Sequence, residues 1–215
     1  MTGDPGRLLV SGKNRFLIVL MLALLIAGAF AMTGALIGWH SQPKVSVSGT
    51  ASIGGPYTLT ATNGQQIDER TYRGKWVLIH FGYTFCPDAC PTALSNISVA
   101  LEKLGARAND LQPLFVTIDP QRDTRDAMAD YLKSFDPRIL GLTGSQDQIN
   151  AVIREYHLYV SRDESDRGGN DYIVSHSSYI YLMDPQGVFA AVLQGTATGD
   201  EIAAWLRNEI AQAGT

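Results

Sequence analysis

The sequence predicts an α/β domain in which helices flank a mixed sheet, preceded by one transmembrane helix. Short apolar runs typical of buried strands alternate with stretches of helical periodicity, and two late strands flank a hairpin turn signal. One long apolar run lies near the N-terminus. With 215 residues, of which 45% are hydrophobic and 18% charged, the chain is long enough for one globular domain with a substantial core.

The run over residues 16–39 contains no charged residue and is long enough to cross a bilayer as a helix. Arg7, Lys13 and Arg15 precede it, and positively charged flanks stay on the cytoplasmic side. We therefore expect residues 1–15 to be cytoplasmic. For a bacterial protein, the anchor would lie in the inner membrane and the domain in the periplasm.

A cleaved signal peptide is the alternative interpretation of the N-terminus. A basic start, an apolar stretch and the small-residue pattern Ala29-Phe30-Ala31 fit it. However, the apolar character continues to Trp39, an aromatic residue suited to the membrane interface. This continuation favours an uncleaved anchor.

Residues 40–55 are rich in Ser and Gly and predict a linker, which leaves residues 56–215 as the domain. Removing residues 1–44 takes away four basic residues and one acidic residue, so the net charge changes from −4 to −7. This net negative charge argues against binding of nucleic acid, whose phosphates are also negative.

The apolar runs order the predicted elements along the domain. Strands are expected at 57–60, 75–81, 114–118, 178–184 and 188–193, with a short apolar run at 140–143. Helical spacing of apolar residues occurs over 94–104, 127–132, 149–156 and 200–210. Asp200 is placed to cap the last helix.

The two cysteines of the chain, Cys86 and Cys90, lie in the segment CPDACP between a strand and a helix. A helix beginning near Pro91 or Thr92 directs its free amides at this loop and favours a thiolate there. A structural disulfide is the default for an exported pair, but a bridge over so short a loop stabilises little. Redox chemistry and binding of a soft metal both remain open.

A copper site with two thiolates needs a third ligand, and four histidines are candidates. His40 lies next to the membrane segment, and His80 lies inside a buried strand, where a core role is the usual one. His157 ends a helical run and is expected to cap it or to face solvent. His176 follows a polar loop over 161–170 and opens a strand, a position suited to presenting a ligand.

Three segments together resemble one family: GYTFCPDACP (82–91), VTIDPQRDT (116–124) and SHSSYIYLMDPQG (175–187). In this order and at this spacing they are similar to the Sco/SenC family, and the resemblance extends over about 57–210. It implies a thioredoxin-like fold, a membrane anchor and a copper-binding protein that assists assembly of the CuA centre of cytochrome c oxidase.

Carried over by position, the resemblance implies that Cys86, Cys90 and His176 bind copper as Cu(I), Cu(II) or both. The family usually has Asp immediately before this histidine, whereas this chain has Ser175. A role of that carboxylate in orienting the imidazole is therefore in doubt.

Charged residues near these motifs have simpler interpretations. Asp88 is expected to cap the helix that follows the cysteines. Asp119, with Pro120, is expected to form a turn. Arg122, Asp123 and Arg125 have the pattern of a solvated helix start.

The implied partners are the oxidase subunit that carries the CuA site and a periplasmic copper donor or thiol reductant. The second candidate function is a thiol–disulfide oxidoreductase that keeps oxidase cysteines reduced, with Cys86 and Cys90 as the catalytic pair. A peroxidase of related fold is a third, because a reactive cysteine and a resolving partner are formally available. His176 distinguishes them, since copper binding needs it and dithiol exchange does not.

Overall fold

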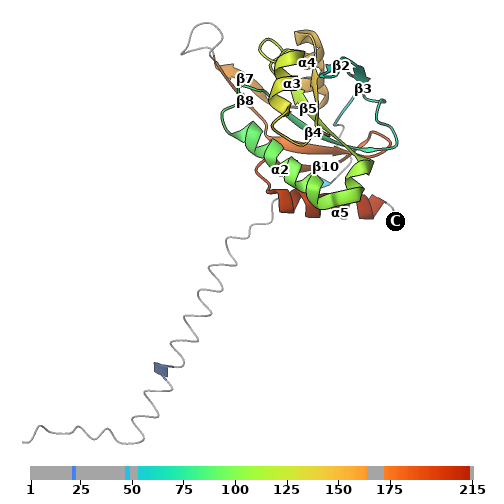
Figure 1. The fold of residues 1–215 in the computed structure, drawn as a ribbon, viewed down its shortest axis with the longest axis vertical. Coiled ribbons are helices and arrows are strands. Elements are labelled where there is room, and N and C mark those ends of the chain that lie inside the picture. Colours follow the sequence, from blue (N-terminus) through green and yellow to red (C-terminus); the bar gives the residue numbers. More distant parts are fainter. Residues whose placement is uncertain (1–20, 23–46, 49–52, 164–171, 214–215) are drawn as a thin grey trace, which may run out of the picture. The chain divides into compact units, whose positions relative to one another are not determined.

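The computed structural model describes residues 21–22, 47–48, 53–163 and 172–213 (Figure 1). The chain divides into two compact units, Met1–Pro43 and Lys44–Thr215, and the fold reported below is that of the second. Within the described ranges no helix is long and apolar enough to cross a membrane. The predicted anchor over 16–39 lies outside them except for residues 21–22, and the predicted cytoplasmic segment 1–15 lies outside them entirely.

The domain is built on an eight-stranded sheet with the order β1-β10-β9-β4-β5-β6-β2-β3. The central pairs β4–β5 and β5–β6 are parallel, and the other pairs are antiparallel, so the predicted mixed sheet is confirmed. The strands are β1 (Val47–Ser48), β2 (Thr58–Ala61), β3 (Gln66–Asp68), β4 (Trp76–Gly82), β5 (Leu111–Thr117), β6 (Leu140–Thr143), β9 (Tyr179–Met183) and β10 (Phe189–Gln194).

Two short strands of the eight-stranded sheet were not predicted from the sequence. Strand β3 lies at one edge of the sheet, and β1 pairs with β10 although residues 47–48 lie within the predicted linker. Gly54, also within that range, donates its N–H to the carbonyl of Glu155. The boundary between linker and domain at residue 55 stays a prediction.

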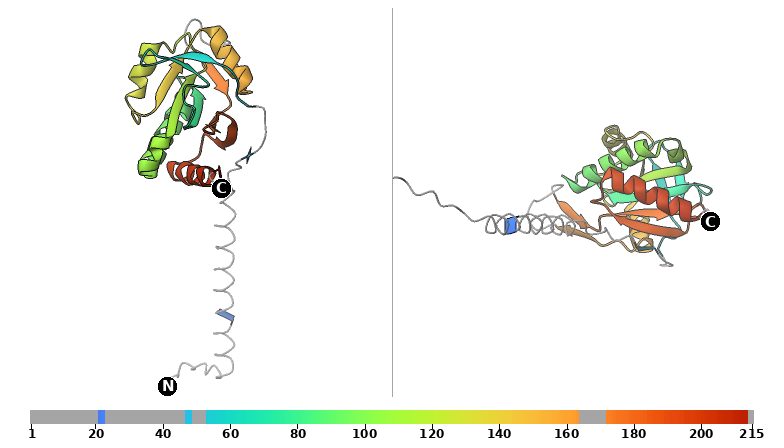
Figure 2. Two further views of the ribbon diagram at one scale, coloured as in Figure 1. Left: turned by 90° about the vertical axis from the view of Figure 1, so that its right-hand side faces the viewer. Right: turned by 90° about the horizontal axis from the view of Figure 1, so that it is seen from below.

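Every residue of β4 is buried because both faces of the central sheet are covered. Leu78 packs into a core with α2, α3 and α5, whereas Val77 and Ile79 pack on the opposite face with α4. Helices α2 (Ala89–Leu104) and α5 (Gly199–Ala213) lie side by side on one face (Figure 2). The remaining helices are the 3₁₀ segment η1 (Gly105–Asp110), α3 (Arg125–Leu132) and α4 (Gln146–Glu155).

Helix α5 begins one residue earlier than predicted, and its cap is Thr198. The Thr198 hydroxyl accepts the N–H of Glu201 at 3.4 Å, and the Glu201 carboxylate accepts the N–H of Thr198 at 2.7 Å. This reciprocal pair is a capping box. The expectation that Asp200 caps the helix was therefore wrong, and its carboxylate pairs with Lys103 of α2 instead.

A hairpin of β7 (Val160–Asp163) and β8 (Ile173–His176) forms a separate two-stranded sheet. Residues 161–163 were expected in a polar loop but belong to β7, and 164–170 lie outside the described residues. His176 was expected to open the strand that became β9, but it is the last residue of β8 instead. The hairpin lies at the same end of the domain as the beginning of α2 (Figure 1).

Candidate metal centre

The cysteine loop follows β4 at its carboxyl end and leads into α2. Cys86 is half-buried in the loop, and Cys90 is fully buried in the first turn of the helix. Both are free thiols. A Cβ at Gly82 would lie 2.6 Å from the Cys90 sulfur, so only glycine lets the end of β4 approach this thiol so closely.

The sulfur of Cys86 takes part in capping α2, because it accepts the backbone N–H of Cys90 at 3.4 Å. Helix α2 begins at Ala89, slightly earlier than predicted, and Pro91 lies in its first turn, where a missing N–H is harmless. The expectation that the Asp88 side chain caps the helix was wrong. Asp88 occupies the N-cap position without a side-chain cap bond, and its carboxylate accepts the Thr92 hydroxyl at 3.3 Å.

The two thiols have opposite acidities. A hydrogen bond from the Cys90 thiol, helped by the amides of Cys90 and Asp88, lowers the pKa of Cys86 well below its ordinary value. The thiolate of Cys86 and burial raise the pKa of Cys90. In the favoured form of the pair, Cys86 is a thiolate that accepts a hydrogen bond from the Cys90 thiol. This agrees with the expected influence of the helix amides.

His176 reaches this pair from β8. Its Nε2 lies 3.8 Å from the Cys90 sulfur, and its Nδ1 lies 2.9 Å from the carbonyl oxygen of Ser177. A carbonyl oxygen accepts only, so Nδ1 carries the proton and Nε2 keeps a lone pair directed toward the sulfurs. A metal-binding imidazole typically has its other nitrogen held in this way.

The three candidate ligands, Cys86, Cys90 and His176, lie close together but are not yet arranged as in a metal site. Among the residues that the structure describes, no group of three or more His, Cys, Asp or Glu side chains is gathered tightly enough to hold a metal ion. The donor set itself, two thiols and one imidazole nitrogen, suits copper.

The other histidines that the structure describes, His80 and His157, have different environments. His80 is completely buried on the α2 side of the sheet, where its Nδ1 lies 3.2 Å from the carbonyl of Tyr179 and its ring stacks with Phe115. Burial lowers its pKa to about 4, so it is neutral in the folded protein at pH 7. His157 is exposed, as expected, and His40 lies outside the described residues.

Asp123 supports the cysteine loop from below and is not solvated, contrary to the expectation. It is fully buried and accepts hydrogen bonds from the N–H and hydroxyl of Thr84 and from the hydroxyl of Thr117, at 2.6–3.0 Å. Burial raises its pKa. The sequence offered no signal for this role, because Thr84 lies in the cysteine loop, 39 residues away along the chain. Arg125 is exposed as predicted.

Asp119 and Arg122 are likewise buried, with 5% of each side chain exposed. Arg122 Nε donates to Asp119 at 2.5 Å, and the Asp119 carboxylate also accepts the Tyr172 hydroxyl at 2.6 Å. Turn formation therefore does not account for Asp119, and Arg122 is not part of a solvated helix start. Both side chains connect the end of β5 to the hairpin that carries His176.

Ser175 lies on the outer face of that hairpin. Along β8, Ile173 and Ser175 are exposed, whereas Val174 is buried and His176 half-buried. Successive side chains of a strand point to opposite faces, so Ser175 faces away from the side occupied by the imidazole.

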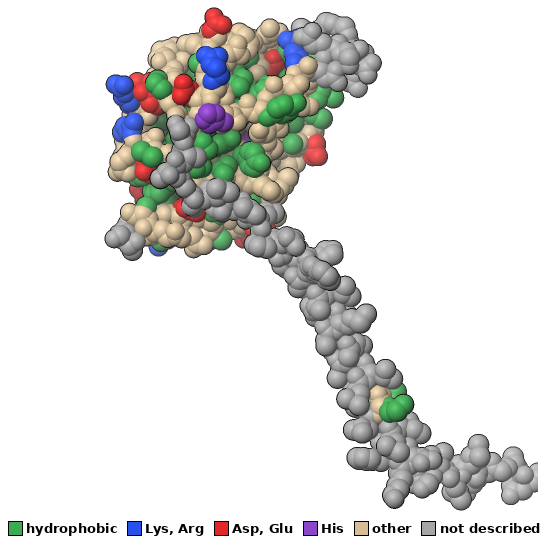
Figure 3. Space-filling model, turned by 180° about the vertical axis from the view of Figure 1, so that it is seen from behind, with side chains coloured by type: hydrophobic (Ala, Val, Ile, Leu, Met, Phe, Trp, Pro, Cys, Tyr) green, Lys and Arg blue, Asp and Glu red, His purple; other side chains and the backbone are tan. Residues whose placement is uncertain are grey.

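Large hydrophobic side chains are exposed around the centre. Phe85, directly before Cys86, is 59% exposed, Ile173 of β8 is 49% exposed and Tyr179 of β9 is 41% exposed. Figure 3 shows one face of the domain, on which hydrophobic side chains reach the surface between charged ones. The surface beside the cysteines is therefore partly apolar.

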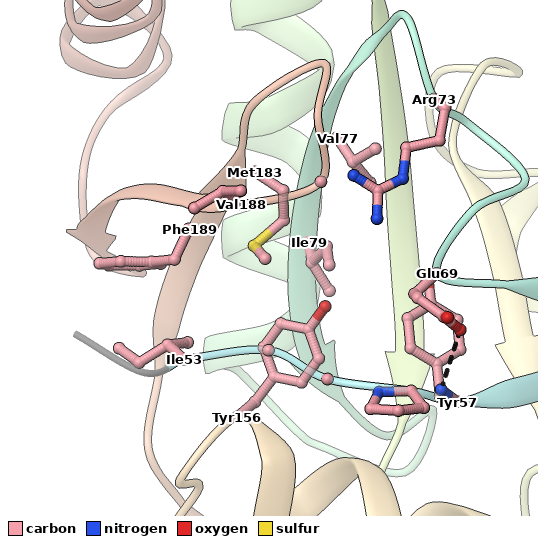
Figure 4. A pocket seen from close by; sticks show the side chains of 14 residues that line it. Ile53, Tyr57, Glu69, Arg73, Val77, Ile79, Tyr156, Met183, Val188 and Phe189 are labelled. Carbon is pink, nitrogen blue, oxygen red and sulfur yellow. Dashed lines mark hydrogen bonds between the residues drawn. The ribbon is translucent and has the colours of Figure 1, made fainter. Parts of the chain in front are cut away.

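A cavity of about 340 Å³ lies at the opposite end of β4 (Figure 4). Val77, Ile79, Met183 and Tyr156 line it, and Arg73 and Glu69 stand at its side. None of the three candidate ligands contributes to it. The cavity is thus separate from the cysteine loop.

The chain is similar to proteins named for the family that the motifs indicate. It is 36% identical over 192 residues to the human mitochondrial SCO1 homolog, covering 83% of this chain and 64% of that protein's length. A SCO2-like protein of Rickettsia prowazekii is 34% identical over 200 residues, covering 90% of this chain and 96% of the relative.

Solved structures of Sco proteins are also similar to this chain. The copper-bound structure of ScoI from Bradyrhizobium japonicum is 41% identical and superposes with a TM-score of 0.67, covering 73% of this chain and 99% of that one. This similarity confirms the expected thioredoxin-like α/β fold. The SCO1/SenC family model matches residues 45–211, and the chain accordingly belongs to the SCO1/SenC family.

Proposed function

We propose that the protein is a copper metallochaperone that assists assembly of the CuA centre of cytochrome c oxidase. The observation that carries the proposal is the meeting of three soft or borderline donors, Cys86, Cys90 and His176 Nε2, at the carboxyl end of β4. Two of its structural relatives, the ScoI proteins of Bradyrhizobium japonicum and Arabidopsis thaliana, hold copper. Sco proteins are described as cytochrome c oxidase assembly proteins.

The chemistry of the three residues suits transient binding of copper. Thiolates favour Cu(I), and an imidazole ligand also admits Cu(II). The lowered pKa of Cys86 means that little free energy is needed to deprotonate the first ligand. Three protein ligands leave a coordination position open, and Cys86 is half-exposed, so an acceptor protein can approach the ion.

The proposal includes the position of the protein in the cell. Residues 16–39 would anchor it in the bacterial inner membrane, with residues 1–15 in the cytoplasm and residues 40–55 leading to the periplasmic domain over 56–215. The partners would be the oxidase subunit that receives the CuA copper and a periplasmic copper donor or thiol reductant.

A thiol–disulfide oxidoreductase is the second candidate, and the asymmetry of the two thiols favours it. Cys86 is acidic and half-exposed, whereas Cys90 is buried and protonated. Attack by an accessible thiolate followed by resolution through a buried thiol is the usual division of labour in such a pair.

The test is copper stoichiometry of the reduced full-length chain, loaded anaerobically, with His176→Ala alongside and His157→Asn as control. We expect one tightly bound copper per chain and a thiolate-to-Cu(II) charge-transfer band, which His176→Ala loses and His157→Asn keeps. Cu(II) binding by His176→Ala equal to that of the unsubstituted chain would refute the ligand assignment. Absence of tight copper together with rapid dithiol exchange would favour the oxidoreductase.

A further inference from the structure

His176 lies on a hairpin outside the main sheet, three residues before Tyr179 of β9. Strands β7 and β8 pair with each other, and neither belongs to the eight-stranded sheet that carries the cysteine loop. Ser177 and Ser178 join β8 to β9 of that sheet, so the backbone limits where His176 can lie, and side-chain contacts between the hairpin and the rest of the domain adjust the distance between the imidazole and the sulfurs.

Arg122 and Asp119 make two of these contacts, both with Tyr172, the residue that precedes β8. Arg122 Nη1 donates to the Tyr172 carbonyl at 2.9 Å, while the Tyr172 hydroxyl donates to Asp119 at 2.6 Å. The bond between Arg122 Nε and Asp119 at 2.5 Å closes the ring. Both charged side chains are almost completely buried, where charge-assisted hydrogen bonds are strong and their loss is costly.

Ring contacts reinforce these hydrogen bonds. The guanidinium groups of Arg122 and Arg162 lie 3.6 and 3.4 Å from the centroid of the Tyr172 ring. Two planar groups at these distances from one centroid must occupy opposite faces, so the ring is enclosed between two cations.

The same arginine also reaches the residue before the cysteine loop. Arg122 lies 5.5 Å from the ring centroid of Tyr83, and the Tyr83 hydroxyl accepts the N–H of Val174 at 3.3 Å. The Tyr83 ring lies edge-on to His176, with 6.1 Å between the ring centroids. Arg122 thus contacts both structures that carry the candidate ligands.

We infer that Arg122, together with Asp119 and Tyr172, is a latch that positions His176 and thereby sets the preference of the site for Cu(II) over Cu(I). This inference rests on the proposed function. Two thiolates suffice for Cu(I), whereas Cu(II) depends on the imidazole. Opening the latch therefore weakens Cu(II) binding much more than Cu(I) binding.

The test uses the full-length chain with the double substitution Asp119→Asn/Arg122→Met, which removes both charges and leaves neither buried alone. The matched control is Asp136→Asn/Arg138→Met, because that Arg–Asp pair, at 2.6 Å, is hydrogen-bonded to Ser98 of α2 and Gln112 of β5, away from the hairpin and the cysteine loop. Tyr172→Phe is the milder variant, since it loses only the bond to Asp119. Affinities for Cu(I) and Cu(II) are measured by competition, and amide exchange of residues 173–176 is measured in the copper-free protein.

We expect the Asp119/Arg122 variant to lose about 10-fold to 100-fold in Cu(II) affinity, the range for residues that orient a ligand. Cu(I) affinity should change by less than about threefold on the same scale. The reduction potential of bound copper should rise accordingly, by about 59 mV for each tenfold difference in a one-electron couple. Exchange of the hairpin amides should accelerate without copper, and Tyr172→Phe should show the same pattern more weakly.

Unchanged Cu(II) affinity in the Asp119/Arg122 variant would overturn the latch. Equal losses of Cu(I) and Cu(II) affinity, the same pattern as in the Asp136/Arg138 control, would also overturn it. If the double variant fails to fold, Tyr172→Phe without a loss specific to Cu(II) would overturn it as well. The proposed function fails separately, namely when His176→Ala itself binds Cu(II) normally.

Discussion

Gly82 and Cys90 are packed so closely that a single methyl group does not fit between them. A Cβ at Gly82 would lie 2.6 Å from the Cys90 sulfur and 2.9 Å from the ring of Phe115. The close contact between Gly82, at the end of β4, and Cys90 is therefore possible only because glycine has no side chain.

Gly82→Ala should lower the free energy of unfolding by about 1–3 kcal/mol, the usual cost of overpacking a core. It should also weaken or shift the thiolate-to-Cu(II) absorption band, because the Cys90 sulfur must move. Gly141→Ala is the matched control, since its Cβ would lie 2.7 Å from side chains of Leu132 and Thr62, far from the cysteines in sequence. An unaltered band in a stable Gly82→Ala protein would contradict the prediction.

Cys86 should react with iodoacetamide before Cys90 does. Its lowered pKa and half-exposed position supply an accessible thiolate, whereas Cys90 is buried and its pKa is raised. At pH 6 in the reduced, copper-free chain, we expect Cys86 to be alkylated at least about tenfold faster, as mapped by mass spectrometry. The denatured chain is the control, in which both thiols should react slowly. Faster modification of Cys90 would show that the acidities are reversed.

His80 should make the folded state less stable as the pH falls. The unfolded imidazole takes up a proton near its ordinary pKa of 6.5, whereas burial lowers the pKa in the folded protein to about 4. Between these values the unfolded chain binds more protons, so stability is lost as pH decreases from 6.5 to 4, by about 3 kcal/mol in total.

His80→Phe should remove this loss, and denaturant unfolding of the copper-free chain at pH 7, 5.5 and 4 measures it. His157→Asn, at an exposed position with φ of 51°, should keep the original pH dependence because asparagine tolerates that backbone conformation. A His80→Phe protein with the same slope as the unsubstituted chain would refute the role of His80.

Ser175→Asp should leave copper binding nearly unchanged, although the family usually has aspartate there. Ser175 lies on the exposed face of β8, and the Nδ1 of His176 is already held by the carbonyl of Ser177. We expect a change in Cu(II) affinity below about threefold, compared with the 10-fold to 100-fold effect of residues that orient ligands. A tenfold gain, measured by competition, would mean that a carboxylate here reaches the imidazole.

Much of the architecture was predictable from local patterns. The largely apolar run at 75–81 predicted the central strand β4, and the spacing of apolar residues over 94–104 predicted α2. The β7–β8 hairpin was missed because its strands are short and partly polar, so their pattern resembles that of a loop.

The central strands, the main helices, the family and the two cysteines of the centre could be predicted from the sequence, because each depends on short-range periodicity or on a motif. The burial of Asp123 and Arg122, and the contact of Ser177 with His176, could be seen only in the folded domain. Whether a charged side chain is solvated or buried depends on partners that are distant in sequence, such as Thr84 for Asp123 and Tyr172 for Arg122. Local sequence patterns cannot reveal those partners, because they become neighbours only when the sheet and the hairpin assemble.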